Sequence, residues 1–207
     1  MVQYRLSARK VSGGRIAKVA SDLMMREGVD AVTMRSVASA CGVTPMAIYS
    51  YYDSSAEMRR AGVDFSLRRV RTPPFEGSVV SRLQHWGHAT RKVLRRRPDL
   101  AAICLTDWPE LPEGCRVMEG LLVVAAEHTA ESAGQVQIAN TVFVYVLTRV
   151  IAERAMVERR TRPNLPAVAA TPRRFARLVD VQSEFKRLDV DRDFATGLDA
   201  LLDGLLR

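Results

Sequence analysis

Residues 44–51 bring together side chains that can contact a nucleic acid. The Thr44 hydroxyl and the Tyr49 phenol can hydrogen-bond to phosphate oxygens, and Met46 and Ala47 can contact the methyl group of thymine. Each also has an ordinary structural explanation: Thr44 as a helix cap, Tyr49 as a core or interface residue, and the other two as merely exposed side chains. We interpret the group as a DNA-contacting surface.

Two histidines could hold a metal ion, but the sequence offers no third ligand. His85 and His88 lie three residues apart, with no cysteine, carboxylate cluster or third histidine at a matching distance, so no metal site is predicted. The three cysteines, Cys41, Cys104 and Cys115, are widely spaced and include no C-x-x-C pair. This spacing argues against a disulfide framework and favours a reducing cytoplasm.

The sequence also lacks the common signatures of catalysis. It contains no G-x-G-x-x-G, G-x-x-x-x-G-K-[ST], H-E-x-x-H or G-x-S-x-G motif. The Gly13-Gly14 pair precedes a predicted helix but lacks the strand and lysine of a phosphate-binding loop. We therefore predict no catalytic residue, no cofactor and no enzymatic activity.

Three short helices must position the candidate DNA-contacting residues. Apolar residues at helical spacing predict a first helix over 16–27, which stops at Gly28. Thr33 is the expected N-cap of a second helix over 34–41, Gly42 ends that helix, and Thr44-Pro45 starts a third that extends to Tyr52. Two helices joined by a tight glycine turn predict a helix-turn-helix, whose second helix enters the major groove of DNA.

The positive charge is concentrated in the same part of the chain. The 207 residues carry a formal charge of +8, and residues 1–71 hold 12 basic and 6 acidic residues. Arg5, Arg9, Lys10 and Arg15 could form an arm along DNA or a flexible tail. The break at Thr72-Pro73-Pro74 predicts a boundary between an N-terminal domain (1–71) and a C-terminal domain (72–207).

The rest of the chain also shows helical periodicity, with almost no strand-like alternation. This pattern predicts an all-α protein with a larger helical C-terminal domain. No apolar run reaches the length of a membrane span, and the N-terminus lacks the apolar core of a signal peptide, so we expect no membrane association. The remaining helices are predicted over 56–69, 78–96, 98–106, 113–132, 135–160, 172–188 and 191–206, with a Pro-rich loop over 161–171.

The N-terminal segment resembles the DNA-binding domain of TetR-family transcriptional regulators. Over residues 15–63 it carries the pattern Gly-Val-Thr/Ser-x-x-x-(Leu/Ile)-Tyr-x-x-aromatic, here Gly42 to Tyr52. It departs from the family in three ways: residues 53–57 lack a frequent phosphate-contacting lysine, Tyr51 replaces a frequent histidine, and Tyr52 a frequent phenylalanine. The resemblance also implies contact between Arg35 and DNA. The predicted DNA-binding residues are Arg35, Thr44, Pro45, Met46, Ala47, Tyr49, Ser50 and Tyr51.

The resemblance implies a homodimer whose C-terminal domains bind a small-molecule effector. The candidate effector-binding residues are Trp86, His88, Leu105, Asp107, Trp108, Tyr145 and Arg149, most of which could instead be core residues. Apolar stripes on the last two long helices predict a dimer interface, with a role in the core of one protomer as the alternative. The candidate interface residues are Val142, Val146, Val150, Leu198, Leu201, Leu202 and Leu205.

Together these features predict a ligand-responsive, sequence-specific DNA-binding regulator in the cytoplasm. We expect a repressor that a small molecule releases from a palindromic operator on double-stranded DNA. The alternative is an all-helical binding or scaffold protein, or an uncommon helical enzyme, whose basic surface is incidental.

Overall fold

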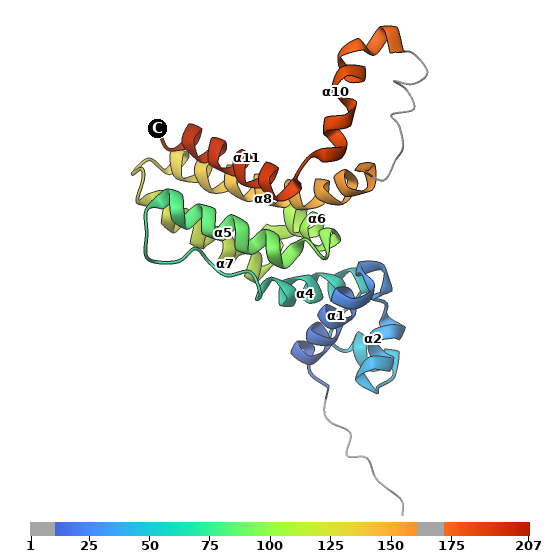
Figure 1. Ribbon diagram of the computed structural model, residues 1–207. Helices are drawn as coiled ribbons and strands as arrows, with labels where there is room; N and C mark the ends of the chain where they lie inside the picture. Colours follow the sequence, from blue (N-terminus) through green and yellow to red (C-terminus); the bar gives the residue numbers. More distant parts are fainter. Residues whose placement is uncertain (1–10, 161–171) are drawn as a thin grey trace, which may run out of the picture.

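The computed structural model describes residues 11–160 and 172–207, which form α-helices and short 3-10 turns with no strand among them. The prediction of an all-α protein is confirmed (Figure 1). The possible basic arm at Arg5, Arg9 and Lys10 and the predicted loop 161–171 lie outside the described residues. The elements are α1 (Gly13–Glu27), η1 (Val29–Ala31), α2 (Met34–Cys41), α3 (Pro45–Tyr49), α4 (Ser55–Leu67), α5 (Val79–Leu94), α6 (Pro98–Asp107), η2 (Trp108–Glu110), α7 (Pro112–Ala126), α8 (Ser132–Arg160), η3 (Pro172–Phe175), α10 (Ala176–Arg187) and α11 (Val190–Leu205).

Side-chain caps define the starts of the N-terminal helices. The Thr33 hydroxyl accepts a hydrogen bond from the Ser36 amide at 3.1 Å, and the Ser36 hydroxyl accepts one from the Thr33 amide, so the predicted N-cap of α2 is confirmed. Gly42 ends α2 at φ +71°, a left-handed conformation that glycine adopts without steric cost. Thr44 stands at the N-cap position of α3, but its side chain makes no capping hydrogen bond among the described residues.

The N-terminal helices pack around the crossing of α1 and α4. Gly62 on α4 faces α1 so closely that a Cβ atom there would lie 2.9 Å from the Ala20 Cβ. The buried hydroxyls of Ser21 and Ser66 hydrogen-bond to each other at 2.7 Å across the same crossing. The short distance between α1 and α4 therefore depends on small residues at the contact.

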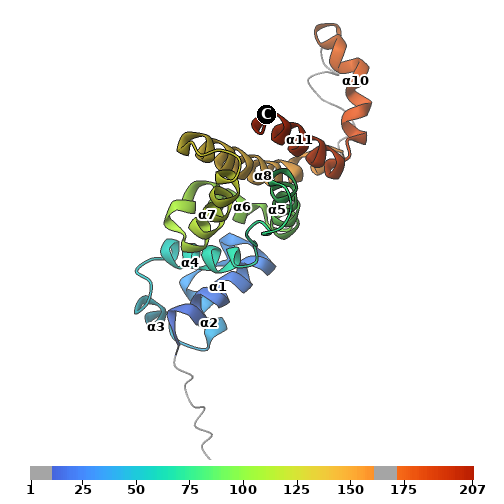
Figure 2. The same ribbon diagram turned by 90° about the vertical axis from the view of Figure 1, so that its left-hand side faces the viewer.

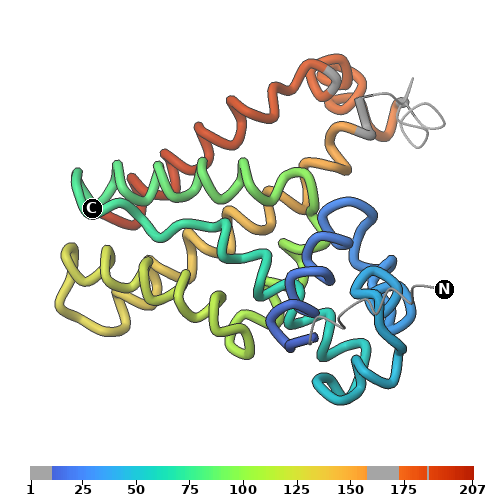
Figure 3. The backbone as a smooth tube through the Cα atoms, turned by 90° about the horizontal axis from the view of Figure 1, so that it is seen from below, coloured from blue at the N-terminus to red at the C-terminus, as the bar shows by residue number. Residues whose placement is uncertain are grey.

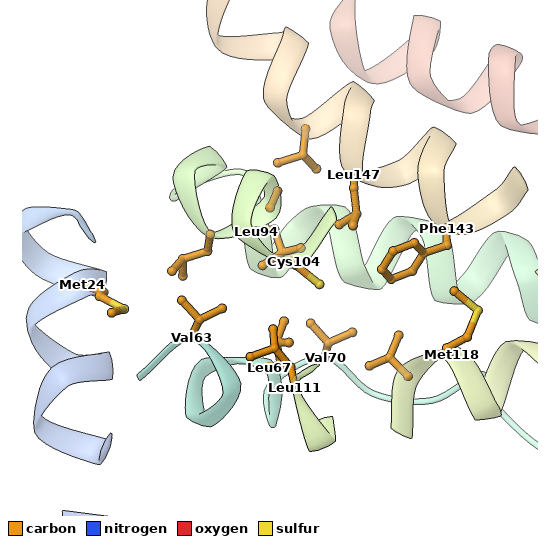
Figure 4. Close-up of a cluster of buried hydrophobic side chains, with 14 of the residues drawn as sticks. Met24, Val63, Leu67, Val70, Leu94, Cys104, Leu111, Met118, Phe143 and Leu147 are labelled. Atoms are coloured by element: carbon orange, nitrogen blue, oxygen red, sulfur yellow. The ribbon is translucent and has the colours of Figure 1, made fainter. Parts of the chain in front are cut away.

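The C-terminal domain is a bundle in which α8 is the central helix. It packs against α5, α6, α7 and α11, and α11 runs beside α5 (Figure 3). The buried core continues from this bundle to α4 and α1: Val63 and Leu67 lie near Leu111 and Phe143 in one apolar cluster (Figure 4). Helix α4 thus contributes to the cores on both sides of the predicted boundary.

Several helices begin or end at other residues than predicted: α1 begins at Gly13 rather than Ile16, and α8 at Ser132 rather than Gln135. α3 ends at Tyr49 rather than Tyr52, and the Tyr51 amide turns back to the Ile48 carbonyl, three residues earlier, at 2.9 Å. α7 ends at Ala126 rather than near Ser132.

One segment, Ser132–Val157 of α8, is long and apolar enough by length and composition to cross a membrane, contrary to the expectation that no segment would be. Its mean hydropathy is 1.2. In the structure its buried residues, such as Phe143 and Leu147, pack inside the helical bundle (Figure 4). The apolar composition of α8 is therefore explained by its central place in the core.

Helix α10 projects away from the bundle, at the end opposite the N-terminal helices (Figures 1 and 2). Three apolar side chains at helical spacing, Leu178, Val181 and Phe185, are exposed on it, to 37%, 44% and 56%. The described residues of one protomer therefore leave this apolar stripe partly exposed.

Candidate DNA-binding interface and effector domain

Two apolar residues, Val43 in the turn between α2 and α3 and Ile48 on α3, hold the short helix α3 against the core. The Val43 amide donates to the Ala38 carbonyl at 3.0 Å, and its side chain packs against the core. Ile48, the inward residue of α3, is fully buried. Helices α2 and α3 lie at one end of the molecule, far from α8 and α11 (Figure 2).

The other residues of α3 face outward. Met46 is 73% exposed and Tyr49 is 47% exposed, both high for large apolar or aromatic side chains. Exposed positions also include Arg35, in the first turn of α2, and Thr44, Pro45 and Ser50, whereas Ala47 is half-buried. All eight predicted DNA-binding residues therefore lie at least partly open to solvent, including Tyr51, which is 44% exposed.

Tyr51 also has a partner within the protein. Its hydroxyl donates to the Val11 carbonyl at 2.5 Å, just before α1 begins. The adjacent Tyr52 hydroxyl donates to the Gly13 carbonyl at 2.9 Å, and burial raises the pKa of this phenol. Both tyrosines therefore tie the end of α3 to the start of α1, and the contact between Tyr51 and DNA stays a prediction.

Nothing in the sequence signalled these two hydrogen bonds, because their partners are backbone carbonyls about 40 residues away. The same holds for Arg59, whose Nε donates to the Val32 carbonyl at 2.9 Å and so joins α4 to the segment before α2. The segment that precedes α4 has no lysine; there Glu57 accepts a hydrogen bond from the Asp53 amide at 2.7 Å.

The candidate effector-binding residues fall into two separate groups. Trp86 is buried in the core, and Trp108 packs edge-on against Phe143 with ring centroids 6.2 Å apart, with Leu105 half-buried beside the same core. This group lies inside the bundle of α5–α8.

The second group faces α11. The Tyr145 hydroxyl donates to the Phe194 carbonyl at 2.9 Å, Arg149 forms an ion pair with Asp193, and exposed His88 packs edge-on against Phe194. The structure thus places the predicted effector-binding residues in separate groups rather than around one point, and their role in ligand binding stays a prediction. The physical reason is helical geometry: residues two apart, such as Trp86 and His88, lie on nearly opposite faces of one helix. Asp107, the seventh, accepts a hydrogen bond from Thr106 at 2.7 Å on the surface.

Most candidate dimer residues belong to the core of one protomer. Val142, Val146, Val150, Leu198 and Leu202 are at most 1% exposed. Gly87 on α5 makes room for Leu198, since a Cβ at Gly87 would lie 2.8 Å from its side chain. These five residues follow the alternative, a core role, whereas Leu201 and Leu205 are partly exposed.

Two sets of hydrogen bonds join the effector domain to the DNA-binding helices. At the start of α6, Asp99 accepts from the Val29 amide at 3.0 Å, and the Arg97 Nε donates to the Met25 carbonyl at 2.9 Å. At the start of α7, the Glu113 amide donates to Asp64 of α4 at 2.7 Å. These hydrogen bonds connect the starts of α6 and α7 to α1, Val29 and α4.

Both parts of the chain match known protein families. Residues 16–61 match the family model described as bacterial regulatory proteins of the tetR family. Residues 73–207 match the model described as the tetracyclin repressor-like C-terminal domain. No curated protein sequence matches the chain.

Several solved structures share the fold. ActR of Streptomyces coelicolor, solved with (S)-DNPA, is 21% identical with a TM-score of 0.75, covering 95% of this chain and 98% of its own. BioQ of Mycobacterium smegmatis is 22% identical with a TM-score of 0.70 and the same two coverages, and BioQ has also been solved with its double-stranded DNA operator. A third is a TetR variant from Acinetobacter baumannii AYE, solved with minocycline; it is 21% identical with a TM-score of 0.70, covering 94% of this chain and 92% of its own.

With both domains matched and the C-terminal match alone covering more than half of its residues, the chain belongs to the TetR family of bacterial regulatory proteins.

Proposed function

We propose that the protein is a ligand-responsive transcriptional repressor that a small molecule releases from a near-palindromic DNA operator. Membership of a family of regulators supports this proposal. So do the structural neighbours, one of which is solved with operator DNA and others with small molecules. We assign no catalytic activity to the chain and place it in the cytoplasm, where an operator is found.

The observation that carries the DNA-binding part is the outward face of α3. Met46 and Tyr49 are exposed on a helix that Ile48 and Val43 anchor firmly to the core. Exposed large side chains on a rigid element are typical of an interaction site. We propose that Met46 and Ala47 read thymine methyl groups, that Thr44, Tyr49 and Ser50 bind phosphates, and that Arg35 and Pro45 complete the contact surface.

The proposed dimer uses the outer surfaces of α8 and α11. Val136 and the half-buried Val144, Leu201 and Leu205 provide apolar area there. We propose that α10, whose apolar stripe is uncovered in one protomer, extends this interface to the partner. A two-fold dimer presents two recognition helices to successive major grooves, about 34 Å apart.

Release by an effector requires that ligand binding and DNA binding favour different arrangements of the two domains. The hydrogen bonds from α6 and α7 to α1 and α4 provide the connection, because a ligand that shifts α6 or α7 also shifts the DNA-binding helices. By linkage, the effector weakens DNA binding by the same free energy by which DNA weakens effector binding.

Selection of bound sequences from a random DNA pool tests the proposal. We expect a near-palindrome whose affinity falls steeply with salt, with a log–log slope of about −0.9 for each phosphate contact. Met46→Ala should relax base preference in each half-site, whereas Val123→Ala, at an exposed position of α7 outside the proposed DNA-contacting and dimer surfaces, serves as the matched control. A flat salt dependence without any preferred sequence would refute the DNA-binding function.

A further inference from the structure

We propose that the effector is an uncharged, mainly apolar molecule whose oxygen atoms accept hydrogen bonds from Trp86 and Thr90 inside the C-terminal domain. This inference rests on the proposed function, since it names the chemical class of the ligand that releases the DNA. It depends on two buried donors that have no acceptor within the described part of the chain.

The two donors are the indole Nε1 of Trp86 and the hydroxyl of Thr90 on α5. The residues are 1% and 2% exposed, and neither atom has a hydrogen-bond partner among the described residues. Buried donors are nearly always paired, because an unpaired one loses its hydrogen bonds to water without replacement. Two such donors on adjacent turns of one helix therefore indicate an absent acceptor.

The behaviour of other threonines makes Thr90 distinctive. A threonine inside a helix commonly satisfies its hydroxyl by donating to a carbonyl one turn earlier. Thr148 does so to the Val144 carbonyl at 2.8 Å, and Thr106 to the Ile103 carbonyl at 3.2 Å. Thr90 makes no such bond among the described residues, so its hydroxyl remains available to another molecule.

Both donors lie on the face of α5 that looks into the bundle. Trp86, Thr90 and Leu94 follow one another at four-residue spacing, which places them along one face of the helix. Leu94 lies near Cys104 and Leu147 in the apolar cluster (Figure 4). The neighbouring face of α5 is used differently: there Gly87 and Arg91 contact α11.

The surroundings of this face are apolar and adaptable. The apolar cluster that contains Leu94 also contains Phe143, against which Trp108 packs edge-on, and Met118, whose flexible side chain can move to make room (Figure 4). A ligand that enters here must displace side chains between α5, α6, α7 and α8. It therefore acts directly on α6 and α7, the helices that hold α1 and α4.

Charge excludes an ionised ligand from this interior. Of the buried cations on α5, Arg82 pairs with Glu127 at 2.6 Å, and Arg91 pairs with Glu153 and Asp191. Burial raises the pKa of Cys104 to about 12, so its thiol is neutral at physiological pH. An ionised group would enter without a counter-charge, which is costly in an apolar medium.

Two other buried atoms, which also lack a hydrogen-bond partner among the described residues, lie elsewhere. Asp99 Oδ1 is at the junction of α6 with the DNA-binding helices, where the other carboxylate oxygen accepts from the Val29 amide. Arg149 Nε belongs to a guanidinium that pairs with Asp193 on α11. Neither atom is part of the α5 face. The groups that a ligand meets there are the two donors of Trp86 and Thr90, so the matching ligand group is a neutral hydrogen-bond acceptor.

Three probes of one shape test the proposal on the full-length protein: fluorene, its ketone 9-fluorenone, and fluorenone-4-carboxylate. Binding is followed by tryptophan fluorescence and operator release by DNA mobility shift. We expect fluorenone to bind more tightly than fluorene by about fivefold for each hydrogen bond gained, and the carboxylate to bind most weakly. We also expect fluorenone to release DNA at a lower concentration than fluorene.

Two variants identify the donor. Thr90→Val keeps the side-chain shape and removes the hydroxyl, so the preference for fluorenone over fluorene should fall while fluorene binding stays the same. Because the variant removes an unpaired donor, its urea-unfolding midpoint should equal or exceed that of the wild type. Thr148→Val, the matched control on α8, removes a hydroxyl that is already paired and should leave the probe preference unchanged.

Several results would overturn the inference while the regulatory function stands. The first is a protein that binds its operator but shows no preference for fluorenone over fluorene. The second is a carboxylate probe that binds most tightly of the three. The third is a Thr90→Val variant that keeps the full preference for fluorenone, because ordered water then satisfies the Thr90 hydroxyl in the wild type. A lower unfolding midpoint in Thr90→Val would also overturn it, because the hydroxyl would then have a partner within the protein. Failure to bind any DNA sequence would instead overturn the proposed function itself.

Discussion

Replacement of Arg91 by methionine should strongly destabilise the C-terminal domain. The guanidinium of Arg91 on α5 forms an ion pair with Glu153 of α8, donates to Asp191 of α11 at 2.6 Å, and lies 4.7 Å above the Phe194 ring. Burial alone would lower the pKa of Arg91, but its hydrogen bonds to Glu153 and Asp191 outweigh this effect and raise the pKa. The side chain is therefore a charged connection among three helices.

The magnitude follows from what the substitution leaves behind. Methionine replaces much of the apolar stem but leaves the Glu153 carboxylate, 8% exposed, without its partner. Breaking a buried ion pair in this way costs about 3–5 kcal/mol, a large part of the 5–15 kcal/mol typical of a folded domain. Lys18→Met is the matched control: the exposed pair with Asp22 contributes less than about 0.5 kcal/mol.

Urea unfolding at neutral pH is the assay. Arg91→Met/Glu153→Leu removes both charges and should recover most of the lost stability at neutral pH. A single variant that loses less than about 1 kcal/mol, or a double variant as unstable as the single one, would refute the reasoning.

Three further predictions concern the DNA-binding end of the molecule. Tyr49→Phe should weaken binding to all DNA sequences by about 1 kcal/mol, as measured by mobility shifts. Tyr52→Phe should instead lower the free energy of unfolding by about 1 kcal/mol in urea, because the Tyr52 hydroxyl donates to a backbone carbonyl. Gly62→Ala should lower stability by about 1 kcal/mol, because the new Cβ would lie 2.9 Å from the nearest side-chain carbon of α1 and the packing cost exceeds the gain in helix propensity. Gly14→Ala, which meets nothing within 4 Å, should raise stability in the same assay, and equal effects of the two would contradict the packing argument. Burial raises the pKa of Asp64 from its usual value of 3.8, so the folded state favours the protonated carboxyl, and stability from this group is lost as the pH rises above that value. In the same assay Asp64→Asn should therefore gain stability relative to the wild type as the pH rises.

The N-terminal motif could be predicted from the sequence because its determinants are local. The Thr33 cap interacts with a residue three positions later, Gly42 adopts its positive φ within the turn, and the buried stripe of α1 repeats every three or four residues. Interactions over such short distances are encoded in neighbouring residues. The all-α fold, the helix-turn-helix and the family resemblance could therefore be recognised without a structure.

Which element covers the buried face of each helix could be learned only from the tertiary structure. An apolar stripe indicates that a helix face is buried, but it does not reveal what covers that face. The stripes on α8 and α11 thus suggested a dimer interface, whereas Val146 and Leu198 meet at Gly87 inside one protomer. The partners of Tyr51 and Arg91 were likewise hidden, since they lie 40 and 62 residues away along the chain. The sequence by itself determined the helices and the exposed recognition element, while only the packing of distant segments decided which polar groups are paired and which, as at Thr90, are left without a partner among the described residues.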